Sequence, residues 1–138
     1  MKASTQLLLE KLKNTGDIAE YLEQNKYELL DETTGSYLTG LLEKRGLKIA
    51  DVAEDSLRGE YVYKVFRDER KASREVLLSI AVGMKLSLAE TQLLLRVARC
   101  AALDPRNRFD SVLLFVLEKG LSVDDANETL AAIGESNL

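Results

Sequence analysis

The chain has 138 residues, a net charge of −4 and 46% hydrophobic residues, with one proline and eight glycines. It contains no histidine and one cysteine, which excludes a histidine-dependent triad, a zinc site of the usual Cys/His kind and an internal disulfide. This length suits one domain with a sizeable core. No apolar run approaches the roughly 20 residues that a membrane-spanning helix requires, and "MKASTQLLLEKLKNTGD" introduces charges too early for a signal peptide. We expect a soluble, cytoplasmic protein without a membrane segment.

The sequence offers no place for catalysis. It lacks a glycine-rich phosphate loop, a nucleophile elbow and an Asp-x-Asp metal motif. We therefore expect a protein that is not an enzyme and that carries no cofactor or metal.

Charge is distributed unevenly along the chain. Residues 1–35 carry 4 basic and 7 acidic groups, residues 36–108 carry 14 and 10, and residues 109–138 carry 1 and 6. A basic middle between acidic ends favours a polyanionic partner on one face of the molecule.

Helix start and stop signals are dense. Ser87 with Glu90, and Ser122 with Asp125, have the spacing of a capping box, in which each side chain bonds the other residue's backbone N–H. Further starts are indicated at Ser73 and at Asp104-Pro105, and stops at Gly46 and Gly120.

These signals predict an all-α fold, a compact bundle of about nine short helices. The expected helices span 4–14, 17–30, 36–45, 48–55, 58–68, 73–84, 87–99, 105–119 and 122–133. Because the connections are short, we expect one compact unit: an N-terminal helical segment (1–34) packing on the core, a central domain (35–99) and a C-terminal helical extension (100–138).

The central part resembles the Xre (Cro and phage-repressor-like) helix-turn-helix family over about residues 36–95. The resemblance rests on Gly46-Leu47, on Val52-Ala53, on the inward positions Leu57, Val62 and Val65, on Arg70-Lys71-Ala72-Ser73 and on Met84-Lys85-Leu86-Ser87. The tail from Cys100 is similar to one group of these proteins from Gram-positive bacteria. The resemblance implies a helix-turn-helix core in which helix 58–68 enters the major groove of DNA.

Three departures from the family pattern fall near the DNA-reading elements. Alignment forces a one-residue deletion at Ser56-Leu57, where the family usually has a turn glycine. Ile49 stands where the family often has a phosphate-anchoring glutamine. Leu42 and Phe66 replace a frequent Arg–Glu ion pair, an exchange that often leaves stability unchanged.

Ten residues are candidates for DNA contact. Arg58 could pair with guanine, Tyr63 could touch a thymine methyl or a phosphate, and Glu60 could accept from cytosine but repels the backbone. Tyr61 and Tyr63, two positions apart, cannot share a helix face, so we expect one to be packed and the other exposed. The full set is Lys48, Arg58, Glu60, Tyr61, Tyr63, Lys64, Arg67, Arg70, Lys71 and Arg74.

Helix 105–119 is apolar on nearly every side around Phe115, which places it either in the core or at an interface. For a homodimer, the predicted interface residues are Phe109, Val112, Leu113, Val116 and Leu117. A second basic cluster, Arg96, Arg99, Arg106 and Arg108, is explained by helix ends and by pairing with Asp104 or Asp110.

Two functions therefore remain open from the sequence. The first is a regulator that binds double-stranded DNA, with helix 58–68 in the major groove. The second is a helix-turn-helix scaffold that binds a protein partner instead.

Overall fold

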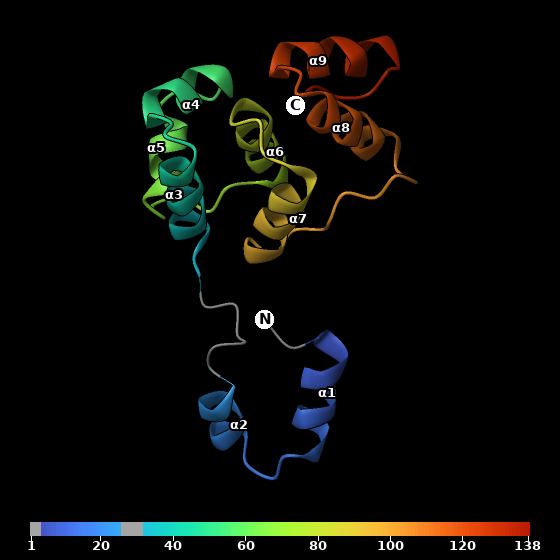
Figure 1. Ribbon diagram of the computed structural model, residues 1–138. Helices are drawn as coiled ribbons and strands as arrows, with labels where there is room; N and C mark the ends of the chain where they lie inside the picture. Colours follow the sequence, from blue (N-terminus) through green and yellow to red (C-terminus); the bar gives the residue numbers. More distant parts are fainter. Residues whose placement is uncertain (1–3, 26–31) are drawn as a thin grey trace. The chain divides into compact units, whose positions relative to one another are not determined.

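The computed structural model describes residues 4–25 and 32–138, and every regular element in that part of the chain is an α-helix, as predicted (Figure 1). The helices are α1 (Thr5–Asn14), α2 (Ile18–Gln24), α3 (Thr34–Lys44), α4 (Ile49–Asp55), α5 (Tyr61–Phe66), α6 (Arg74–Gly83), α7 (Leu88–Val97), α8 (Arg108–Lys119) and α9 (Val123–Ala132). None of them is long and apolar enough to cross a membrane.

The chain divides into two compact units, with the boundary after Asp31. The first contains α1 and α2, and the second contains α3 to α9. That residues 1–34 pack on the rest of the chain stays a prediction, and the part of the expected helix 17–30 beyond Asn25 lies outside the described residues.

The first unit is a pair of short helices with little interior. Ser4 and Asp17 cap α1 and α2 by accepting backbone N–H groups. Tyr21 and Asn25 are buried, and the Asn25 side chain donates to the Tyr21 carbonyl over 2.9 Å. Five large apolar side chains of this unit remain exposed: Leu7, Leu9, Leu12, Ile18 and Leu22.

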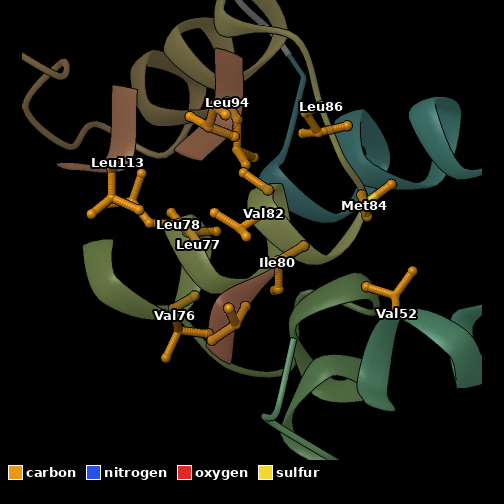
Figure 2. Close-up of a cluster of buried hydrophobic side chains, with 14 of the residues drawn as sticks. Val52, Val76, Leu77, Leu78, Ile80, Val82, Met84, Leu86, Leu94 and Leu113 are labelled. Carbon is orange, nitrogen blue, oxygen red and sulfur yellow. The ribbon is translucent and has the colours of Figure 1, made fainter. Parts of the chain in front are cut away.

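The second unit is built around α6. All seven residues from Val76 to Val82 are buried, so this part of the helix has no face exposed to solvent. It contacts α4 on one side, and α7, α8 and α9 on others. Figure 2 shows α6 side chains such as Leu77 and Ile80 surrounded by Val52 of α4, Leu94 of α7 and Leu113 of α8.

The local signals in the sequence placed most helix ends correctly. Ser87–Glu90 and Ser122–Asp125 form the predicted capping boxes, and Ser73 caps α6. Gly46 and Gly120 take the predicted left-handed conformation, with φ of 63° and 64°.

The start predicted at Asp104-Pro105 is wrong. Asp104 accepts the Arg106 N–H over 2.9 Å and so forms a tight turn. The helix begins only at Arg108, where the Asn107 side chain accepts the Asp110 N–H.

The predicted dimer helix is part of the core. In α8, Val112, Leu113, Val116 and Leu117 are at most 8% exposed, and Phe109 packs partly buried against them. The four aliphatic side chains are therefore taken up by the chain's own core and are not free to form the expected interface. That the chain forms a homodimer stays a prediction. Phe115, on the same helix, is 53% exposed.

The start of α7 is tied to α3 through Glu90. Its carboxylate accepts the Ser87 N–H over 2.9 Å and pairs with Arg45, the residue that follows α3. The Tyr37 hydroxyl of α3 donates to the Glu90 carbonyl over 3.2 Å. Burial by itself would raise the pKa of Glu90, but the Ser87 N–H and the Arg45 guanidinium outweigh it and hold the pKa below its ordinary value of 4.5.

Candidate nucleic-acid interface

The connection between α4 and α5 spans residues 56–60 and contains two left-handed positions. Leu57 has φ 61° and Gly59 has φ 58°. The Leu57 N–H donates to Glu54 O (3.1 Å) and the Gly59 N–H to Ala53 O (3.0 Å), so the segment folds back over the end of α4. Leu57 was predicted to face inward, but it is 54% exposed, because the left-handed backbone turns its side chain out of the core.

This turn shortens the helix that was expected to read DNA. The prediction of a helix over 58–68 is wrong at both ends, because the regular part runs only from Tyr61 to Phe66. Its last turn closes at Arg67, and Asp68 then takes a left-handed conformation with φ 57°. Six residues are fewer than two helical turns.

The inner side of α5 is firmly packed. Val62 and Val65 are buried as predicted, and Phe66 is 7% exposed. Phe66 and Leu42 of α3 belong to the same hydrophobic cluster, where the resemblance had placed an apolar pair in place of an ion pair. Packing of its apolar side therefore holds α5 in place within the second unit.

The expectation for the two tyrosines is corrected. Tyr61 and Tyr63 are both half-buried and both pack against the core cluster. Because α5 contacts α3 and α4 at once, residues on two sides of so short a helix each meet a neighbour.

Five of the cations that were predicted to contact DNA are exposed. Lys48 precedes α4, Lys64 lies on α5, and Arg67, Arg70 and Lys71 follow it. Arg67 lies 3.6 Å from Glu69, a pair in which both side chains are more than half exposed. Such a pair is screened by solvent and leaves the charge of Arg67 available to a stronger anion. Glu60, Tyr63, Lys64 and Arg67 line an open pocket of about 370 Å³.

Arg58 is anchored on the protein itself. Its Nε donates to the Ser79 hydroxyl of α6 over 3.2 Å, and Ser79 is fully buried. The side chain is half-buried, and its bond to Ser79 holds it against α6. It is therefore not free to contact a base, as a residue at the start of a DNA-reading helix would be.

Arg74 is not available as a phosphate anchor. Nη1 and Nη2 donate to the two oxygens of Asp110, each over 2.9 Å. Nε and Nη2 also donate to the carbonyls of Ala101 and Ala102. Since the guanidinium already serves a buried carboxylate and two carbonyls, we correct the prediction and assign Arg74 to the link between α6 and α8.

The four arginines of the second basic cluster differ in their ionic contacts. Arg106 lies 3.4 Å from Asp104, as predicted, whereas Arg108 pairs with Glu135 over 3.5 Å and not with Asp110. Arg96 and Arg99 are exposed and have no ionic partner among residues 4–25 and 32–138. Sequence reasoning had assigned these two arginines to helix-end electrostatics, and no local pattern distinguishes them from the paired ones.

In the part of the chain that the structure describes, no three Cys, Asp or Glu residues are placed to hold a metal ion. Comparison with known proteins gives no match: no protein-family model, curated protein or solved structure is similar to this chain.

Proposed function

We propose that residues 32–138 bind double-stranded DNA, chiefly through its phosphate backbone. The contacting surface would be the cationic edge, defined as Lys64, Arg67, Arg70 and Lys71. The observation that carries the proposal is that these four exposed cations lie on α5 and the segment directly after it, while the other side of α5 is buried in the core. A helix that is packed on its apolar side, with exposed cations on it and in the segment after it, can approach a duplex without rearrangement.

Base reading would contribute little to this binding. Arg58 is held by Ser79, Glu60 carries a negative charge, and Tyr61 and Tyr63 are half-buried. Phosphate contacts position a protein on DNA but carry no sequence information directly. We therefore propose a DNA-binding regulator, acting in the cytoplasm, whose affinity depends strongly on salt and weakly on sequence.

Fluorescence anisotropy with a labelled duplex tests the proposal. Affinity should fall steeply between about 50 and 200 mM salt, with a log–log slope close to −0.9 for each phosphate contacted. The double variant Lys64→Ala/Arg67→Ala should weaken binding and reduce the magnitude of the slope by about 2.

The matched control is Arg106→Ala/Lys119→Ala, which removes the same charge from exposed positions outside the cationic edge. It should leave both the affinity and the slope close to those of the unaltered chain. The proposal is wrong if the unaltered protein does not bind at 50 mM salt, or if both double variants lose affinity equally.

A protein-binding role is favoured by a different observation, at the connection between α4 and α5. Leu57 exposes more than half of its side chain beside the anchored Arg58 and the anionic Glu60, a mixture that suits a protein surface better than a phosphate backbone. Under this alternative, Leu57→Ser would abolish association with a partner protein, and Lys64→Ala/Arg67→Ala would not.

A further inference from the structure

A second positively charged site lies beside the start of α3. Three segments distant in sequence line an open pocket of about 310 Å³: the residues that begin α3, the loop before α6 and the end of α7. We call it the Arg99 pocket. Its lining residues are Thr33, Thr34, Asp68, Arg70, Lys71, Ala72, Val97, Ala98 and Arg99.

The single carboxylate of the Arg99 pocket is already engaged by the protein. Asp68 accepts the Thr33 hydroxyl over 2.7 Å and the Gly35 N–H over 2.9 Å. Arg70, Lys71 and Arg99 are exposed, and none is paired with a carboxylate in the described chain. The pocket therefore contains three cations and one carboxylate, and that carboxylate already accepts hydrogen bonds from Thr33 and Gly35.

Arg99 also occupies a left-handed backbone position. Its φ is 60°, a left-handed conformation that favours glycine, and it closes the end of α7 as the Cys100 N–H donates to Leu95 O over 2.8 Å. Three other non-glycine residues have a positive φ: Leu57, whose apolar side chain is exposed, and Asp68 and Lys85, whose side chains bond Gly35 and Gly120. The Arg99 side chain is exposed, lines the pocket and has no ionic partner within the described residues, so its guanidinium is available to an anion there.

We propose that the Arg99 pocket binds the oxyanion of a phosphate ester. Arginine presents a planar set of donors that matches phosphate oxygens, and Lys71 adds a point charge. Thr34 also lines the pocket, and its hydroxyl can supply a further donor. Arg96 lies nearby, because it lines an adjacent pocket together with Arg99.

The ester can come from the DNA backbone or from a small phosphorylated compound. Only the first source rests on the proposed function, because Arg70 and Lys71 also belong to the cationic edge. The pocket would then extend the DNA contact from α5 to the end of α7. The volume is at the lower end of the roughly 300–1,000 Å³ that is usual for small-ligand sites, which suits the second source.

The test uses the full chain labelled with ¹⁵N and two probes, pyrophosphate and a duplex. Pyrophosphate should shift the amide signals of residues 33–35, 70–72 and 97–100 together and saturably. Arg99→Gly removes the guanidinium at a position whose backbone favours glycine, so the variant should fold at least as well as the unaltered chain. It should weaken the binding of pyrophosphate, of the duplex or of both by about tenfold, as expected for a charge-assisted hydrogen bond.

Lys71→Gln is the second variant, and Arg106→Gln, at an exposed arginine outside the pocket, is the control. A loss confined to the duplex would identify DNA as the source, and a loss confined to pyrophosphate would identify a small phosphorylated compound. Pyrophosphate binding by a chain that fails to bind any duplex would support the Arg99 pocket and refute the proposed function. The pocket proposal is overturned if Arg99→Gly and Lys71→Gln bind both probes as the unaltered chain does, or if Arg106→Gln loses as much affinity.

Discussion

The guanidinium of Arg74 and the carboxylate of Asp110 form a two-point ion pair that joins the start of α6 to α8. Both contacts measure 2.9 Å, and the Asp110 side chain is only 6% exposed. Asp110 also accepts the Asp104 N–H over 3.0 Å, so the pair holds the irregular segment between α7 and α8 as well.

Removing one partner of this pair should be strongly destabilising. Arg74→Ala leaves a buried carboxylate without its counter-charge, and we expect the free energy of unfolding to fall by about 3–5 kcal/mol. Urea unfolding followed by circular dichroism measures it. Arg106→Ala breaks the exposed pair with Asp104 and should cost no more than about 1 kcal/mol, so equal losses would contradict a structural role for Arg74.

Two glycines of α3 should respond to alanine in opposite ways. A Cβ on Gly35 would lie 2.4 Å from the Phe66 carbonyl and 2.6 Å from Asp68, so Gly35→Ala must push α3 away from the end of α5. At Gly40 a Cβ meets nothing within 4 Å. Gly40→Ala should therefore raise the free energy of unfolding by about 0.5–1 kcal/mol, from helix propensity alone. Thermal unfolding of the two variants checks the contrast, which fails if both changes have the same sign.

Leu57→Gly should stabilise the left-handed turn before α5. The side chain is mostly exposed and φ is 61°, so Leu57→Gly relieves backbone strain and removes little buried area. We expect a gain of about 0.5–1 kcal/mol, since the strain of about 1–2 kcal/mol is partly offset by the greater freedom of glycine in the unfolded chain. Gly59→Ala, at φ 58°, should lose about 1 kcal/mol in the same denaturant titration. A loss of stability in Leu57→Gly would show that the exposed leucine packs in solution.

Stability should decrease in acid because of Glu90. Its pKa in the folded chain lies below the ordinary value of 4.5, so its contribution is complete above that value and is lost as the pH falls through the folded pKa. Glu90→Gln can keep the reciprocal cap to Ser87 but not the charge that pairs with Arg45. The difference in unfolding free energy between the two proteins should therefore shrink from pH 7 to pH 3 in urea titrations. A difference that is constant with pH would contradict this role of the charge.

Local chemistry determined the helices of this protein and most of their ends. The Ser87–Glu90 and Ser122–Asp125 boxes, the Ser73 cap and the Gly46 and Gly120 stops all lie within a few residues of the groups they satisfy. Such hydrogen bonds form with little dependence on the rest of the chain, so the sequence pattern is sufficient to predict them. Asp104-Pro105 shows the limit of this reasoning, because the same residues that can start a helix can also form a turn.

The tertiary structure decided which surfaces are free. The sequence of an apolar helix such as α8 does not show whether the helix lies in a core or at an interface. Its packing against α6 and α9 places it in the core. Arg74 and Arg99 are equally basic in sequence. Arg74 is neutralised by Asp110, which is distant in the chain, and Arg99 faces a pocket built from three separate segments. Local sequence signals therefore determined the helices. Long-range packing determined which charges and apolar faces remain available for a partner.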